Sequence, residues 1–245
     1  IPWRYGDKSV LLDVLRVTAH TGEAKGLEDQ TIQWVKKSEL PKFNFPAANQ
    51  GILLALRLAD SYMISGEFKD LEEFVTRLET QLKKGIKIIQ LRAKHLSDDA
   101  LDSHIYEARR LCNKYHADVL VNTAVGKAKE MGVGIHLSSQ RLMSCTERPL
   151  DHKSLVAASV HNEHELQHAN RIGVDFIVVS PVKLTHSHPD ANPLGWDRFK
   201  QLTAQSSVPV FALGGMSADD IATACSYGAQ GIAAISCFWN ENEKT

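Results

Sequence analysis

The fold of this chain is decided by one stretch, Pro209-Val210-Phe211-Ala212-Leu213-Gly214-Gly215-Met216-Ser217-Ala218-Asp219-Asp220. The run up to Leu213 predicts a buried parallel strand, because a strand covered on both faces carries apolar side chains without alternation. Ser217 with Asp219 and Asp220 predicts the start of a helix, since a Ser cap and acidic first-turn residues suit its free N–H groups and its dipole. A strand, a turn and a helix form the repeating unit of a β/α barrel.

The same alternation extends outward from this unit over residues 61–245. Eight short apolar runs predict strands at residues 62–64, 86–91, 118–121, 134–137, 155–160, 175–179, 209–213 and 231–235. Further helix-start signals lie at Ser97 and at Asn162. The pattern predicts an α/β fold, a (β/α)8 TIM barrel. An open doubly wound sheet is the alternative, and it would favour a Gly-rich turn where the chain has Ser65-Gly66-Glu67-Phe68.

Residues 1–58 have a different pattern. Residues 10–17 and 31–35 predict two strands, and residues 50–58 predict a helix. A strand–strand–helix piece of this size buries little surface alone, so we expect it to pack on another part of the protein. The sequence therefore predicts two domains, residues 1–58 and residues 61–245.

The bulk composition is ordinary for a globular protein, with 43% hydrophobic residues, 23% charged residues and a net charge of -1. This balance gives no basic surface for nucleic acid or an anionic membrane. No apolar run approaches the roughly 18 residues of a membrane span. The cysteines, Cys112, Cys145, Cys225 and Cys237, are scattered without a CxxC motif, which indicates reduced thiols. We expect a cytoplasmic protein with no nucleic-acid or membrane partner.

A ligand of such a barrel binds at the carboxyl ends of the strands, and phosphate often binds at the loops after strands seven and eight. Strand seven ends at Gly214-Gly215, and strand eight ends at Ile235-Ser236. Paired glycines let a phosphate approach backbone N–H groups, and a helix starting near Ser217 would point its N-terminus at the anion. The alternative is that Gly214-Gly215 only makes a tight turn between strand and helix.

Strand two adds basic groups to the same end of the barrel. Gln90, Arg92 and Lys94 share one side of that strand by its period of two, and two cations with an amide suit a diphosphate. The alternative is a solvated strand end that happens to be basic. Polar groups also end the next three strands near the mouth, namely Asn122, His136, and Ser159 with His161. Asn122, His136 and Ser159 are candidate ligand-binding residues, and the alternative for each histidine is a packed or capping side chain.

The loop after strand six, residues 180–190, carries Lys183 and Thr185 and could fold over an anion as a lid. His186, His188 and Asp190 in this loop are one alternative, a zinc site. His164 and His168 are a second pair, on a helix face that we expect to meet solvent. Neither set supplies a full ligand set in register, so no metal site is assigned.

Together these motifs resemble the thiamine-phosphate synthase/TenI family over about residues 61–240. The residues that carry the resemblance are Gln90-Leu91-Arg92-Ala93-Lys94, Gly134-Ile135-His136-Leu137, Ser159-Val160-His161, Ser180-Pro181-Val182, Leu213-Gly214-Gly215-Met216 and Ile232-Ala233-Ala234-Ile235-Ser236. Synthases of this family join an aminopyrimidine diphosphate to a thiazole phosphate. The resemblance implies these binding residues: Gln90, Arg92, Lys94 and Asn122 facing the pyrimidine diphosphate, Ser159 and Thr185 near the diphosphate, and Gly215, Ile235 and Ser236 on the thiazole phosphate.

The chain departs from the family at its metal ligands. Thr123 and Arg141 stand where synthases have two Asp residues that bind Mg²⁺, and His188 stands where they have a lysine. Pro181 aligns near the catalytic His of TenI-type tautomerases. These departures argue against Mg²⁺ in the barrel and against synthase (transferase) activity, and they leave the catalytic residues unassigned. A phosphorylated thiazole or thiamine-related ligand stays the expected partner. Three roles stay open: an enzyme of thiamine-phosphate metabolism, a non-catalytic sensing module, and a structural scaffold for the N-terminal part. The retained Gly214-Gly215 and the Gln90, Arg92 and Lys94 cluster argue against the scaffold.

The first 58 residues resemble the C-terminal end of a MutT-type Nudix hydrolase, an 8-oxo-dGTP diphosphatase-like domain. The matching features are residues 11–17, Gly22-Glu23, Gly26-Leu27-Glu28, Gln33-Trp34-Val35 and Phe45-Pro46-Ala47-Ala48-Asn49. The resemblance implies that Asn49 reads an oxidised guanine base. The catalytic box that holds Mg²⁺ is absent, so we expect no hydrolase activity and no cofactor in this chain. The missing Nudix segment is then an expected partner, which the barrel would regulate. Association of the chain into a homo-oligomer is a further possibility.

Overall fold

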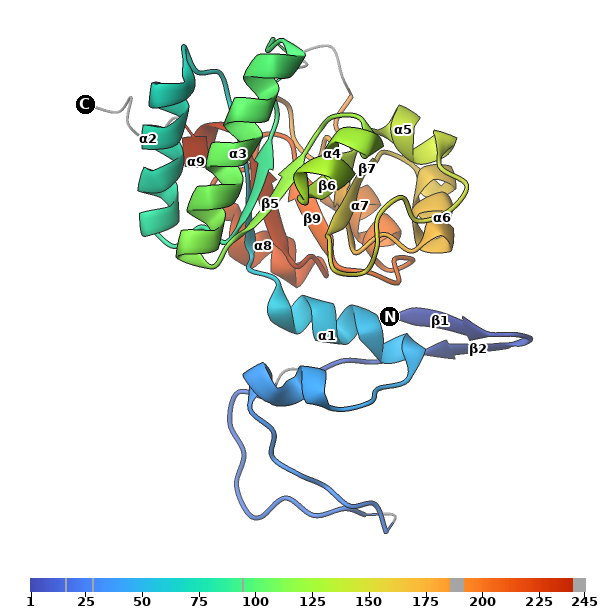
Figure 1. The fold of residues 1–245 in the computed structure, drawn as a ribbon. Coiled ribbons are helices and arrows are strands. Elements are labelled where there is room, and N and C mark those ends of the chain that lie inside the picture. Colours follow the sequence, from blue (N-terminus) through green and yellow to red (C-terminus); the bar gives the residue numbers. More distant parts are fainter. Residues whose placement is uncertain (16, 28, 94, 186–191, 240–245) are drawn as a thin grey trace.

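Eight parallel strands close into a barrel that forms most of the molecule (Figure 1). The computed structural model describes residues 1–15, 17–27, 29–93, 95–185 and 192–239. The barrel strands are β3 (Ser61–Ile64), β4 (Ile88–Leu91), β5 (Asp118–Val121), β6 (Gly134–Leu137), β7 (Val156–Val160), β8 (Phe176–Val179), β9 (Val210–Leu213) and β10 (Gly231–Ala234). They pair in chain order, and β10 closes the ring on β3. The predicted (β/α)8 barrel is confirmed, and the open sheet is wrong.

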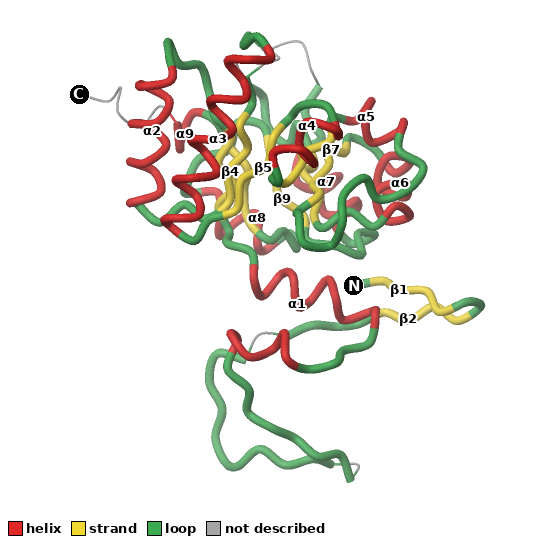
Figure 2. The backbone as a smooth tube through the Cα atoms, viewed as in Figure 1, coloured by secondary structure: helices red, strands yellow, loops and turns green. Residues whose placement is uncertain are grey.

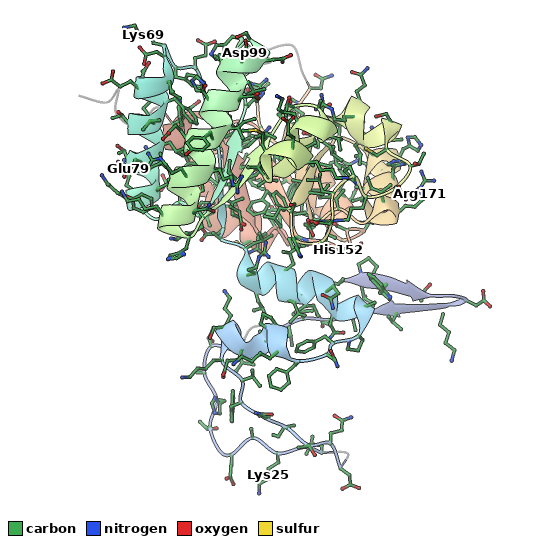
Figure 3. The ribbon with its side chains drawn as sticks, in the orientation of Figure 1. Lys25, Lys69, Glu79, Asp99, His152 and Arg171 are labelled. Carbon is green, nitrogen blue, oxygen red and sulfur yellow. The ribbon has the colours of Figure 1, made fainter. Side chains whose placement is uncertain are left out.

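A helix follows each of these strands and covers the outside of the barrel. The helices are α2 (Leu71–Lys83), α3 (Asp98–Tyr115), α4 (Val125–Met131), α5 (Ser139–Ser144), α6 (Glu163–Ile172), α7 (Gly195–Thr203), α8 (Asp220–Ser226) and α9 (Ser236–Trp239). The side chains of Ser97 and Asn162 accept backbone N–H bonds at the starts of α3 and α6, so these two predicted caps are confirmed. Figure 3 locates the two ends of the barrel, with the labelled Asp99 at the end where the strands finish and His152 at the other.

The apolar side chains divide between the interior of the barrel and the layer beneath the helices. The interior cluster consists of Leu58, Tyr62, Ile64, Ile88, Leu120, Leu155, Ala157, Phe176, Val178, Phe211 and Ala233. Tyr62 is fully buried there and meets Phe176 edge-to-face at a centroid distance of 5.2 Å. The alternate strand residues point outward, as Met63 and Val160 do, and pack against the helices. Because the interior is packed with side chains, the barrel has no room for a ligand inside it, and the loops at the carboxyl ends of the strands are the expected binding region.

The N-terminal segment contains little regular structure (Figure 2). It has a hairpin of β1 (Pro2–Tyr5) and β2 (Lys8–Leu11), two 3-10 turns η1 (Lys37–Lys42) and η2 (Ala47–Asn49), and helix α1 (Gln50–Arg57). The helix predicted at 50–58 is confirmed. The strands predicted at 10–17 and 31–35 are wrong, because β2 already ends at Leu11 and residues 31–35 form no strand. Leu15 and Trp34 are 81% and 80% exposed, so no second surface covers the apolar side chains that favoured a strand.

Helix α1 belongs physically with the barrel. It lies against the end where the strands begin (Figure 1), and Leu58, only 6% exposed, closes that end of the interior cluster. Gln230 ties the two parts together, since its side-chain amide donates to the carbonyl oxygens of Ala55 at 3.1 Å and Leu58 at 3.0 Å. Over the residues that the structure describes, none of the helices has the length and apolar character to cross a membrane.

Candidate functional site

The predicted binding residues of strand two lie at the open end of the barrel, which we call the mouth. Gln90 is paired with Ile64 of β3 and Leu120 of β5 and is only 2% exposed, so it forms part of the floor of the mouth. Arg92 follows β4 and is partly buried. Its backbone N–H donates to the Ser65 hydroxyl at 2.8 Å, and that hydroxyl lies 3.3 Å from the Arg92 carbonyl oxygen. Ser65, which the sequence did not single out, therefore fixes the position of Arg92.

A line of three polar side chains crosses the floor of the mouth from β3 to β7. The Tyr62 hydroxyl lies 3.0 Å from His136 Nδ1, and His136 Nε2 lies 2.8 Å from the Ser159 hydroxyl. Tyr62 is fully buried and His136 is 2% exposed, whereas Ser159 is partly exposed. His136 therefore meets protein groups at both ring nitrogens, and only Ser159 can present a polar atom of this line to a ligand.

Burial and a neighbouring cation together keep the His136 imidazole neutral. Removal of the ring from water lowers the pKa of His136 from 6.5 to about 3, and the positive charge of Arg92 acts in the same direction. Arg92 follows β4 at the same end of the barrel, where its backbone N–H is bonded to Ser65. The resulting site has one cation and one hydroxyl at a buried, polar floor, which suits an anion.

Asn122 is a further predicted residue at this floor, and its side-chain nitrogen already makes a bond within the protein. Its side-chain nitrogen donates to the His136 carbonyl oxygen at 3.2 Å, and its backbone N–H donates to Leu91 at 3.2 Å. The bond to His136 joins the ends of β5 and β6. His161 is similar, because its Nδ1 donates to the carbonyl oxygen of Ser180 at 2.7 Å.

The paired glycines after β9 pack directly against the loop that follows β8. Gly214 and Gly215 have positive φ angles of 105° and 63°. A Cβ on Gly214 would lie 2.9 Å from Pro181, and one on Gly215 would lie 2.4 Å from the Leu184 carbonyl oxygen. Lys183 N–H donates to the Gly214 carbonyl at 3.1 Å. The glycines thus have a structural reason to be there, which gives weight to the tight-turn alternative, although Gly215 itself stays exposed.

The start of α8 differs from the prediction. The helix begins at Asp220 instead of near Ser217, although the Asp220 carboxylate accepts both the Ser217 N–H at 2.9 Å and the Ser217 hydroxyl at 3.0 Å, as the later residue of a capping box does. Lys183 pairs with the same carboxylate at 2.5 Å. Burial alone would raise the pKa of Asp220, but the bonds from Lys183 and Ser217 outweigh it and the pKa is lowered. The Asp220 carboxylate therefore occupies the Ser217 N–H and the Lys183 ammonium, two of the groups that were predicted to face an anion.

The remaining predicted residues are spread around the mouth or fall outside the described structure. Ile235 is partly buried and Ser236 is exposed at the first position of α9, while Thr185 is partly exposed in the β8 loop. Lys94, His186, His188 and Asp190 lie outside the described residues.

His168 corrects an expectation, because it does not face solvent. It is 8% exposed, its Nε2 bonds the Cys145 carbonyl at 2.8 Å, and its Nδ1 lies 2.6 Å from Arg171. Its role is to hold α6 against α5. Its neighbour His164 is exposed, so the two rings do not share a face that could hold zinc.

The residues present do not fit the Mg²⁺ site that the resemblance implies. Thr123 offers a hydroxyl and Arg141 a cation where carboxylates would bind the metal. Within the described ranges, no group of three or more His, Cys, Asp and Glu side chains is placed to hold a metal ion. One guanidinium nitrogen of Arg141 is buried without a hydrogen-bond partner among the described residues, and such a group favours an anion over a cation.

Comparison with known proteins decides the family. Residues 61–238 match the family of thiamine monophosphate synthases. The chain belongs to this family. It is 35% identical over 184 residues to a candidate thiamine-phosphate synthase 2 of Aquifex aeolicus, which covers 75% of this chain and 99% of that relative.

Two further relatives are longer than this chain. A thiamine-phosphate synthase of Synechococcus is 30% identical over 167 residues, or 67% of this chain and 47% of the relative. One of Prochlorococcus marinus is 30% identical over 207 residues, or 84% and 57%. The chain thus spans about half the length of these two relatives. The solved thiamine phosphate pyrophosphorylase of Pyrococcus furiosus shares the fold, with a TM-score of 0.60, 22% identity, and coverage of 78% of this chain and 88% of that one.

Proposed function

We propose that the barrel binds a phosphorylated thiazole or thiamine-related ligand at its mouth. The observation that carries the proposal is the partly exposed Ser159 hydroxyl, bonded to the buried His136 at the same barrel end at which Arg92 follows β4. A guanidinium and a hydroxyl at the edge of a desolvated floor bind a phosphate oxygen more strongly than they would in open water. Membership of the thiamine monophosphate synthase family supports the choice of ligand.

We further propose that this binding does not depend on Mg²⁺. Thr123 and Arg141 replace the carboxylates through which the resemblance implies a metal, and the charge of Arg141 itself favours an anion. The same replacement favours a second role for the barrel, a module that binds its ligand without synthase chemistry. Product formation from the two synthase substrates distinguishes a transferase from a sensing module, since a sensing module binds both without joining them.

The N-terminal segment carries a separate proposal, that it is the C-terminal part of a MutT-type Nudix domain. The support is the motif set ending at Asn49 and the exposure of Leu11, Leu15, Leu27 and Trp34, which the rest of such a domain would cover. Asn49 directly precedes α1 at the barrel end opposite the mouth. We expect the unaltered chain to bind an oxidised guanine nucleotide weakly and Asn49→Ala to abolish this binding. Absence of binding in the unaltered chain contradicts the proposal.

Replacement of Arg92 tests the proposed anion site. Arg92→Gln keeps a polar side chain but removes the charge, so we expect binding of inorganic diphosphate to weaken about tenfold or more. Arg110→Gln is the matched control, because Arg110 pairs with Glu107 on the exposed side of α3. Isothermal titration without Mg²⁺ measures both. Equal affinity in Arg92→Gln and the unaltered protein would remove Arg92 from the site.

A further inference from the structure

The line Tyr62–His136–Ser159 fixes where its protons lie. Within the part of the chain that the structure describes, the Tyr62 hydroxyl has one hydrogen-bond partner, His136 Nδ1 at 3.0 Å. The hydroxyl is fully buried among the aromatic rings of Phe176 and Phe211. A buried hydroxyl that cannot donate its proton is costly, so the Tyr62 O–H donates and His136 Nδ1 accepts.

The proton of His136 must then sit on its other nitrogen. A neutral imidazole carries one N–H and one acceptor nitrogen, and with Nδ1 accepting, the N–H is at Nε2. This nitrogen lies 2.8 Å from the Ser159 hydroxyl oxygen, so His136 donates and Ser159 accepts. The reverse arrangement would leave the Tyr62 proton unsatisfied in the barrel interior. Protonation of both nitrogens is opposed by burial and by the charge of Arg92.

The Ser159 hydroxyl is the outer end of this line. Its oxygen accepts the hydrogen bond from His136 Nε2–H, so its own O–H points away from His136. Ser159 is partly exposed at the mouth, whereas the two groups behind it are buried. A serine hydroxyl ordinarily rotates between donor and acceptor roles, but here the bond from His136 occupies one lone pair and directs the O–H away from His136.

We propose that Tyr62 and His136 are positioning residues that hold the Ser159 hydroxyl as a hydrogen-bond donor facing the mouth, so that this position selects an anionic oxygen of the ligand. The inference rests on the proposed function for the existence of a ligand, but the proton order itself does not. Tyr62 and His136 touch no ligand, since both are buried in the floor, and they act only through Ser159. Because His136 is neutral far below neutral pH, the donor role of Ser159 stays the same across the physiological range.

Removal of one oxygen atom tests the line. Tyr62→Phe keeps the ring in the interior cluster but releases His136 to take either tautomer, so Ser159 loses its fixed direction. We expect inorganic diphosphate to bind this variant about tenfold more weakly than the unaltered protein. Tyr115→Phe is the matched control, because it also removes a bonded tyrosine hydroxyl, 2.8 Å from Glu79 on the outside of the barrel. Its affinity for diphosphate should not change.

A double-mutant cycle separates positioning from general damage. In a Ser159→Ala protein the hydroxyl that the line directs is gone, so adding Tyr62→Phe should cause no further loss of diphosphate affinity. His136→Gln should restore part of the affinity that His136→Leu loses, because a Gln amide can still donate to Ser159. Additive losses in the cycle, or equal losses in the two His136 variants, overturn the inference.

The tautomer has a direct readout that needs no ligand. Long-range ¹H–¹⁵N correlation spectra of the imidazole should show the His136 proton on Nε2 in the unaltered protein and a mixture of tautomers in Tyr62→Phe. A proton on Nδ1 in the unaltered protein refutes the inference even if diphosphate binds. If the unaltered protein has the proton on Nε2 but binds no diphosphate, the proposed function fails while the proton order stands.

Discussion

At the scale of single residues, burial of the His136 imidazole makes the folding stability depend on pH. In the unfolded chain a histidine takes up a proton near pH 6.5, whereas folded His136 does so only near pH 3. Above the unfolded pKa both states are neutral and folding is unaffected. Below it the unfolded chain binds more protons, so stability falls as pH decreases from about 6.5 toward about 3.

This difference predicts the acid stability of a variant. The contribution of His136 to the loss is about 1.4 kcal/mol for each pH unit in this window, and His136→Gln removes it. The slope of unfolding free energy against pH, from urea titrations, should therefore be shallower in His136→Gln. Identical slopes would mean that His136 is protonated in the folded barrel.

Only some of the polar residues at the mouth can be predicted from the sequence. Gln90, Arg92 and Ser159 follow from the ends of predicted strands, because parallel strands end together. Tyr62 and Ser65 do not, since their roles depend on which strands face each other across a closed barrel. A tyrosine in an otherwise apolar strand was the available signal, because a buried hydroxyl needs a partner.

At the scale of elements, the turn Gly214–Gly215 couples two loops. Its glycines have positive φ, and the β8 loop lies so close that a side chain would collide with it. The turn therefore sets the distance between the loop after β8 and the start of α8. Lys183 reinforces the contact through its ion pair with Asp220.

Gly215→Ala tests this coupling, with Gly173→Ala as the matched control. Gly173 ends α6 with φ of 73° and nothing within 4 Å of an added Cβ, so its change causes only backbone strain of about 1–2 kcal/mol. Gly215→Ala adds a collision with Leu184, so its melting temperature should fall further and its diphosphate affinity should fall as well. Equal melting temperatures for the two variants would show that the loop gives way without cost.

Apolar runs predict the barrel strands correctly but not the strands of the N-terminal segment. The eight barrel strands follow from continuous apolar runs, because each is covered on both faces. Residues 10–17 carry the same kind of residues, yet only the first two enter β2. An apolar run forms a strand only when a partner strand and a covering layer exist. The run alone does not show whether either is present.

At the scale of the whole molecule, α1 and Leu58 close the end of the barrel where the strands begin. The predicted boundary at residue 58 falls within this contact. Removal of residues 1–49 should leave the melting temperature nearly unchanged, because most of that segment is exposed. Removal of residues 1–58 exposes the interior cluster and loses the two Gln230 bonds, so the melting temperature should drop by several degrees. Equal melting temperatures would contradict the closing role of α1.

The central claim is that the mouth holds a phosphorylated ligand without a metal. Isothermal titration of the whole chain with thiamine phosphate, once in EDTA and once with Mg²⁺, measures it most directly. We predict saturable binding with the same affinity in both solutions. Arg92 and Arg141 carry the positive charge, and Ser159 offers the hydrogen bond, that would replace a metal at the phosphate oxygens. Absence of binding in both solutions, or binding that appears only with Mg²⁺, would contradict the claim.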